Sequence, residues 1–168
     1  LISPEYNVRN MLIGRKKALR YGHDRVPVGY FPDTFGNMGQ APQIMKLSGF
    51  DTVAFGRGVT PTWFNNQIGQ GDFDSTYSEM WWQSPDKDKV LAILFANWYS
   101  NGNEIPVDRD KAKKYWTQKL ADAEKFASTP DLLFMNGVDH QPPQMDVTKA
   151  IKVANELFPD YEFIHSNF

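Results

Sequence analysis

Groups able to carry out nucleophilic or acid–base chemistry stand at three points of the sequence where an apolar run ends. Asp33 follows the first run, Arg57 the second, and Asp139 with His140 the third. Two carboxylates flanking a glycosidic bond can cleave it, since one attacks the anomeric carbon while the other protonates the leaving oxygen. A guanidinium beside the attacking carboxylate would keep it ionised and bind substrate hydroxyls. These residue types make Asp33 and Asp139 candidate catalytic groups and Arg57 a candidate substrate-binding cation.

Aromatic side chains supply a second feature suited to sugars. They make up 14% of the 168 residues, and flat rings pack well against sugar faces or within a large core. We expect Tyr99 and His140 to join Arg57 in binding substrate. Pairs such as Trp81-Trp82 and Trp98-Tyr99 more often belong to a buried core than to a ligand platform.

A βαβ unit is predicted to position the first two groups. Residues 26–31 and 51–55 are short apolar runs typical of buried strands, and residues 43–47 predict a short helix ending at Gly49. Residues 132–135 and 161–164 predict the strands of a second such unit, around a helix capped by Asp146 and stopped at Pro159. Alternating strands and helices predict an α/β fold with a parallel sheet.

Three further elements complete the prediction. Ser3-Pro4-Glu5 begins a helix that would end at Gly22. Residues 79–83 and 90–95, joined by a turn at residues 84–88, predict a β-hairpin. From Asp108 onward, apolar residues at three- to four-residue spacing predict a long amphipathic helix.

Strand ends determine where the chemistry should lie. In parallel α/β folds, functional residues gather just past the carboxyl ends of the strands. Asp33, Arg57 and Asp139 are therefore expected to converge on one rim of the sheet.

The same residues also allow plainer interpretations. Pro-Asp is a common turn dipeptide, so Asp33 fits a turn or the cap of the following helix. Asp139 beside His140 fits a hydrogen-bonded loop pair, and Arg57 between two glycines is typical of a surface loop. No two of the three histidines have the spacing of a metal-binding pair such as His-x₃-His, so residues 1–168 alone do not predict a closed metal site.

Composition excludes several classes of partner. The net charge is −2 and no Lys/Arg cluster is dense enough to follow a phosphate backbone, which argues against nucleic acid. No apolar run approaches the roughly 18 residues that span a bilayer, which argues against a membrane. The chain has no cysteine, as expected for a reducing, cytoplasmic compartment. It begins at Leu1 and stops just after a predicted strand, so we expect a fragment of one catalytic domain that lacks its N- and C-terminal parts.

The segment around Asp33 resembles a known family. Residues 29–37, Gly-Tyr-Phe-Pro-Asp-Thr-Phe-Gly-Asn, followed by Gln-Ala-Pro-Gln, are similar to the nucleophile segment of glycoside hydrolase family 38, the α-mannosidases, and most similar to its bacterial branch. Arg57 matches a family arginine that contacts the nucleophile and the substrate, and residues 136–140 resemble the segment that carries the acid/base carboxylate. Many members have histidine where this chain has Asn37.

This resemblance implies a fold, a reaction and a cofactor. The fold would be part of a seven-stranded parallel βα barrel with an inserted β-hairpin, and the reaction would be hydrolysis of α-mannosides with retention. The family binds zinc through a His-x-Asp motif, the nucleophile and a further histidine; Asp33 matches one ligand, and the others would lie outside residues 1–168. The substrate would be an oligosaccharide or other α-mannoside, and assembly into a homo-oligomer is compatible with the sequence.

Two other functions remain open from the sequence. One is a retaining α-glycosidase of the same fold that acts on another sugar. The other is a carbohydrate-binding or scaffold module whose aromatics hold glycan without cleaving it. A Rossmann nucleotide domain is disfavoured, because no Gly-x-Gly-x-x-Gly follows any predicted strand.

Overall fold

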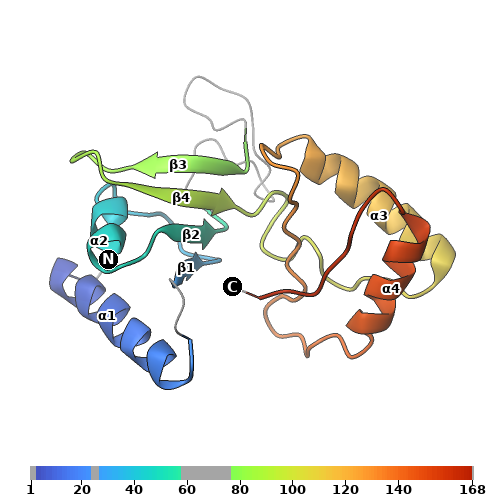
Figure 1. Cartoon of the computed structure of the whole chain (residues 1–168), viewed down its shortest axis with the longest axis horizontal. Coiled ribbons are helices and arrows are strands. Elements are labelled where there is room, and N and C mark those ends of the chain that lie inside the picture. Colours follow the sequence, from blue (N-terminus) through green and yellow to red (C-terminus); the bar gives the residue numbers. More distant parts are fainter. Residues whose placement is uncertain (1–2, 24–26, 58–76, 168) are drawn as a thin grey trace. The chain divides into compact units, whose positions relative to one another are not determined.

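The computed structural model describes residues 3–23, 27–57 and 77–167 (Figure 1). Its elements in chain order are α1 (Pro4–Arg20), β1 (Val28–Phe31), α2 (Ala41–Leu47), β2 (Thr52–Phe55), β3 (Glu79–Gln83), β4 (Lys89–Leu94), α3 (Arg109–Glu124) and α4 (Val147–Leu157). The chain divides into two compact units. Unit 1 consists of Leu1–Gly58 with Glu79–Leu94, and unit 2 of Val59–Ser78 with Phe95–Phe168.

Unit 1 is built on a four-stranded mixed sheet of order β1-β2-β4-β3. β1 pairs parallel with β2, β2 pairs parallel with β4, and β3 pairs antiparallel with β4. The central strand β2 buries Val53, Ala54 and Phe55, as an apolar run flanked on both sides by parallel neighbours should. The predicted βαβ unit and the predicted β-hairpin are both confirmed, although Val26 of the first predicted strand lies outside the described residues.

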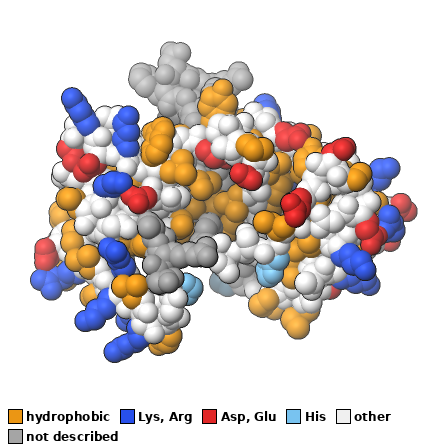
Figure 2. All heavy atoms as spheres, viewed as in Figure 1, with side chains coloured by type: hydrophobic (Ala, Val, Ile, Leu, Met, Phe, Trp, Pro, Cys, Tyr) orange, Lys and Arg blue, Asp and Glu red, His pale blue; other side chains and the backbone are white. Residues whose placement is uncertain are grey.

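The two helices of unit 1 differ in burial. α2 buries Ala41, Pro42, Ile44 and Met45, and Gly49 follows it with φ 85°, the left-handed conformation that stops a helix. α1 has no buried residue, and its Arg15 donates to the carbonyl of Ser48 at 3.3 Å. In Figure 2 basic side chains gather over α1 with apolar ones between them. The exposed apolar residues of α1 are Tyr6, Leu12, Ile13 and Leu19.

Unit 2 contains α3 and α4 packed around an aromatic core. Asp108 is the N-cap of α3, and its carboxylate accepts from the backbone N–H of Lys111 at 3.0 Å, which confirms the predicted start of this helix. Trp116 is 2% exposed and packs edge-on against Phe134 with ring centroids 5.1 Å apart. Its ring also lies 4.6 Å from that of Phe163. The buried residues of this core are Ile105, Trp116, Leu120, Ala150 and Ala154.

The prediction that the chain forms part of a seven-stranded parallel βα barrel is wrong. The described ranges hold one four-stranded sheet, and its last partner, β3, runs antiparallel. The hairpin is not an insertion beside the sheet, since β4 pairs directly with β2 from Thr52↔Leu91 to Phe55↔Leu94. The alternation of apolar runs predicted buried strands correctly in unit 1, but it carries no information on how many strands pair or in which direction.

The predicted second βαβ unit is also wrong. Its helix exists as α4, but residues 132–135 and 161–164 form neither strand nor helix. Their polar backbone groups bond to side chains instead: Met135 N–H donates to Asn101, and Phe163 N–H donates to Asn155. Both segments are apolar because Phe134 and Phe163 pack on Trp116, and that is the pattern a buried strand would also show.

No helix in the described ranges is both long and apolar enough to cross a membrane.

Candidate functional site

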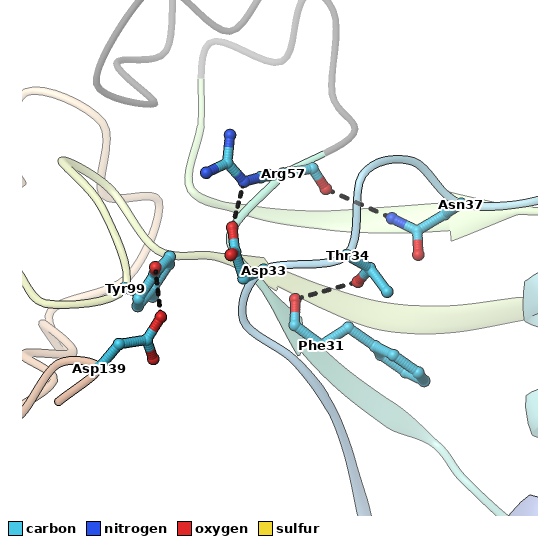
Figure 3. Close-up of polar contacts among 7 residues, drawn as sticks. All are labelled: Phe31, Asp33, Thr34, Asn37, Arg57, Tyr99 and Asp139. Atoms are coloured by element: carbon cyan, nitrogen blue, oxygen red, sulfur yellow. Dashed lines mark hydrogen bonds and ion pairs between the residues drawn. The ribbon is translucent and has the colours of Figure 1, made fainter.

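Asp33 and Arg57 form an ion pair in unit 1. Asp33 follows β1 and Arg57 follows β2, and these neighbouring parallel strands end side by side at Phe31↔Phe55. Arg57 Nε donates to Asp33 Oδ1 across 24 positions of sequence (Figure 3). The side chains are 28% and 37% exposed, so the pair is partly desolvated yet open to a ligand. The contact predicted from strand-end position is therefore present.

The loop between Asp33 and α2 holds Arg57 from two further directions. Arg57 lies over the ring of Phe35, with the guanidinium carbon 4.7 Å from the ring centroid. Asn37 Nδ2 donates to the backbone carbonyl of Arg57 at 3.3 Å. Phe35 is 86% exposed, which is unusual for a phenylalanine and leaves its ring accessible. α2 has Gln40 as its N-cap, so Asp33 does not cap the helix that follows it.

The turn at residues 34–36 accounts for this geometry. Thr34 Oγ1 donates to the carbonyl of Phe31 at 3.5 Å, and Gly36 N–H donates to the carbonyl of Thr34 at 2.9 Å. Gly36 has φ 113°, which L side chains rarely adopt. The chain therefore reverses immediately after Asp33 and brings Phe35 back to the guanidinium.

Tyr99 and Asp139 are in contact in unit 2. The Tyr99 hydroxyl donates to Asp139 Oδ2 at 3.5 Å across 40 positions of sequence (Figure 3). Asp139 and His140 are both exposed, and His140 has φ 64°. A left-handed non-glycine residue next to a candidate catalytic carboxylate is the kind of strain that clusters at functional sites.

The predicted residues thus occur as one contact in each unit. Asp33 pairs with Arg57 in unit 1, and Tyr99 pairs with Asp139 in unit 2. Their catalytic and substrate-binding roles stay predictions.

Two residues of these sites were not predicted from the sequence. One is Phe35, whose ring stacks on Arg57. The other is Asn101, a buried amide that joins the segment of Tyr99 to that of Asp139. The sequence signals that could have found them are an aromatic residue two positions after the candidate nucleophile and the dipeptide Asn101-Gly102, repeated as Asn136-Gly137.

A metal site is not formed by the described residues alone. Within residues 3–23, 27–57 and 77–167, no three His, Cys, Asp or Glu side chains are grouped so that they could hold an ion. Asp33 offers one carboxylate, and Arg57 occupies one of its two oxygens. A zinc ion bound here would need ligands from elsewhere in the protein.

Comparisons with known proteins found relatives along the whole chain. Residues 1–167 match the family described as Glycosyl hydrolases family 38 N-terminal domain. The chain is 60% identical over 168 residues to a protein of Halalkalibacterium halodurans named "Putative mannosylglycerate hydrolase" and covers 19% of it. It is also 60% identical, with a TM-score of 0.89, to the crystal structure of an alpha-mannosidase from Enterococcus faecalis V583, over 99% of this chain and 18% of that one. The chain thus spans about a fifth of the length of these relatives.

Proposed function

Because the chain belongs to glycoside hydrolase family 38, we propose that the protein containing it is a retaining, exo-acting α-mannosidase. Asp33 is its nucleophile, Asp139 its acid/base, and Arg57, Tyr99 and His140 bind substrate. The observation that carries this proposal is the ion pair between Asp33 and Arg57 at the ends of two adjacent parallel strands. A carboxylate held by a guanidinium keeps one orientation, which a nucleophile requires.

The proposed reaction has two steps. An Asp33 oxygen attacks the anomeric carbon, the glycosidic C–O bond breaks, and the Asp139 carboxyl gives its proton to the departing oxygen. The mannosyl ester of Asp33 is then cleaved by a water molecule, which Asp139 deprotonates as it approaches the anomeric carbon. Two inversions give net retention, and Asp139 ends protonated as it began.

Zinc is the cofactor we propose for the protein, with Asp33 as one ligand. A bound zinc ion would hold substrate hydroxyls as a Lewis acid. The remaining ligands would come from outside the described residues. The two steps described above therefore name only side chains of this chain. A cytoplasmic location and a homo-oligomeric state remain predictions from the sequence.

A second candidate substrate is mannosylglycerate. It is favoured by the 60% identity to the Halalkalibacterium halodurans protein named for that hydrolysis. The chemistry at the anomeric carbon would be unchanged, but the leaving group would be glycerate, which carries its own carboxylate. Comparing kcat/KM for mannosylglycerate, α-mannobiosides and aryl α-glycosides of other sugars separates these substrates.

Trapping the covalent intermediate tests the proposed function. A fluorinated mannosyl fluoride should inactivate the zinc-supplied protein, because it forms the glycosyl ester faster than the ester hydrolyses. Peptide mass mapping should then place the label on Asp33. A label on another residue, or first-formed product of inverted configuration, would contradict the assignment.

A matched pair of variants completes the test. Asp33→Asn should lower turnover by a factor on the order of 10⁴ or more, since it removes the nucleophile. Asp51→Asn is its control, because Asp51 is an exposed aspartate of unit 1 that pairs with Lys46 in the same way. Tight mannoside binding by wild-type protein without any hydrolysis would instead favour a carbohydrate-binding module.

A further inference from the structure

The side chain of Asn101 joins two segments of unit 2. It is 2% exposed, and its Nδ2 donates to the carbonyls of Ala96 and Leu133, both at 3.0 Å. Its Oδ1 accepts from the N–H of Met135 at 2.7 Å. One amide therefore fixes residues 96–101, which carry Tyr99, to residues 133–135, which lead to Asp139. We call Asn101 and these three bonds the Asn101 clasp.

Neighbouring bonds extend the clasp toward the candidate acid/base. Gly102 N–H donates to the carbonyl of Met135 at 3.0 Å, and Asn136 Nδ2 donates to the carbonyl of Gly102 at 2.9 Å. The backbones approach so closely that a Cβ on Gly102 would lie 2.8 Å from Cβ of Phe134. The two segments are thus fastened up to three residues before Asp139.

The segment that the clasp holds is strained. Asn97 and Trp98 are consecutive left-handed residues, with φ 61° and φ 90°. Such conformations are unfavourable for residues with side chains and persist only where surrounding contacts over-determine them. The Tyr99 ring stacks on that of Trp98, with centroids 4.7 Å apart. The Tyr99 hydroxyl reaches Asp139 (Figure 3).

We propose that Asn101 is a positioning residue for the acid/base step: it holds Tyr99 and the Asp139 segment in the arrangement in which the Asp139 carboxyl reaches the leaving oxygen. This inference rests on the proposed function, since it assigns to Asn101 a role in that reaction. Asn101 itself is buried, so it would act through the two segments that it joins. Without the clasp, relaxation of Asn97 and Trp98 would move the Tyr99 hydroxyl away from Asp139.

Leaving-group dependence distinguishes positioning from general stability. A dinitrophenolate leaves without a proton, whereas a simple alkoxide needs one from Asp139. The value of kcat/KM reports the steps up to formation of the intermediate, in which that proton is given. A misplaced Asp139 should therefore slow a methyl mannoside much more than a dinitrophenyl mannoside. The ratio of the two kcat/KM values does not depend on how much of a variant is folded.

The experiment measures this ratio in the zinc-supplied complete protein. Asn101→Ala removes all three bonds, while Asn101→Asp keeps the volume and the acceptor but loses both donations. Both should raise the dinitrophenyl-to-methyl ratio at least about tenfold, a fraction of the roughly 10²–10⁴ that general acid catalysis supplies. Asp139→Ala, measured alongside, should raise it further in the same direction.

Asn155 provides the matched control. It also makes three side-chain bonds to backbone, donating to Ile151 and Phe163 and accepting from the N–H of Phe163. Asn155→Ala should destabilise unit 2 to a similar degree and leave the ratio unchanged. An unchanged ratio in both Asn101 variants, with wild-type activity intact, would overturn the positioning role alone. Wild-type protein that cleaves neither mannoside would overturn the proposed function and this inference with it.

Discussion

The orientation of the Asp33 carboxylate depends on Arg57, and that of Arg57 depends on Phe35. Arg57 donates through Nε, the guanidinium nitrogen bonded to Cδ, and its two terminal nitrogens point away from Asp33 (Figure 3). Phe35 supports the guanidinium through a cation–π contact at 4.7 Å. The arrangement requires a planar cation rather than a positive charge alone.

Arg57→Lys tests that requirement. Lysine keeps the charge but offers no planar fork and stacks poorly on Phe35. We expect kcat/KM to fall about ten- to a hundredfold, as loss of a charge-assisted hydrogen bond of about 1.5–3 kcal/mol would give. Arg109→Lys is the control, because Arg109 makes an exposed 2.6 Å pair with Glu156. Steady-state kinetics that show equal losses in both variants would remove the special role of Arg57.

Part of this site was predictable from the sequence. The pairing of Asp33 with Arg57 was predictable because both follow strands of one βαβ unit, and parallel strands end at the same edge. The roles of Phe35 and Asn101 were not predictable. An exposed ring and a buried amide acquire such roles only from tertiary partners distant in sequence.

At the scale of elements, the predictions that held are those with a local cause. α3 begins at Asp108 because its side chain caps the first turn, and the β3–β4 hairpin turns at the predicted residues. The second βαβ unit failed because apolar alternation reports burial and not hydrogen-bond partners. Asn101 and Asn155 take the backbone donors of residues 135 and 163 that a neighbouring strand would otherwise have paired.

Tyr115 makes the stability of α3 sensitive to alkaline pH. Burial raises the pKa of Tyr115 to about 12, with Glu104 adding a smaller effect, and its hydroxyl donates to the carbonyl of Asn103 at 2.9 Å. The unfolded chain loses this proton near pH 10, while the folded chain keeps it. The unfolded state therefore binds fewer protons between about pH 10 and 12, and stability falls as pH rises through that window.

Tyr115→Phe should weaken this alkaline loss of stability. The free energy of unfolding, measured by urea titration at several pH values, should fall less steeply above about pH 10 than in wild type. At neutral pH the variant should lose about 1 kcal/mol, because the hydrogen bond to Asn103 is gone. Tyr21→Phe, at an 80% exposed position, is the control for loss of a hydroxyl. An identical pH slope in Tyr115→Phe would contradict the prediction.

At the scale of the whole molecule, each unit has its own core. In unit 1 the sheet buries residues of β2 and β4, and α2 packs against β4. In unit 2 α3 and α4 pack around Trp116. The indole N–H of Trp116 finds no hydrogen-bond partner among the described residues, so its contribution comes from ring packing alone.

Truncation of Trp116 should therefore lower the stability of unit 2 strongly. Trp116→Ala is expected to reduce the free energy of unfolding by about 3–5 kcal/mol, measured by denaturant titration. Trp116→Phe keeps a ring and removes the unpaired N–H, so it should lose distinctly less. Ile164→Ala, at a 71% exposed position of the same unit, should change it by less than about 1 kcal/mol. Comparable losses at residues 116 and 164 would mean that the aromatic cluster is not the core.

The Asn101 clasp also affects where the protein should undergo deamidation. An asparagine followed by glycine loses its amide most readily, because the unhindered nitrogen of the glycine attacks the side-chain carbonyl and closes a succinimide ring. Asn101-Gly102 and Asn136-Gly137 both have this sequence, but in the first the glycine N–H is bonded to Met135 and the amide is held at both ends. The Asn136 Nδ2 also donates, to the carbonyl of Gly102 and to Gln144 Oε1, but Asn136 is exposed and Gly137 has φ 144°. Because Asn136 is exposed and Asn101 is buried, deamidation should begin at Asn136, three residues from Asp139, while the folded state protects Asn101.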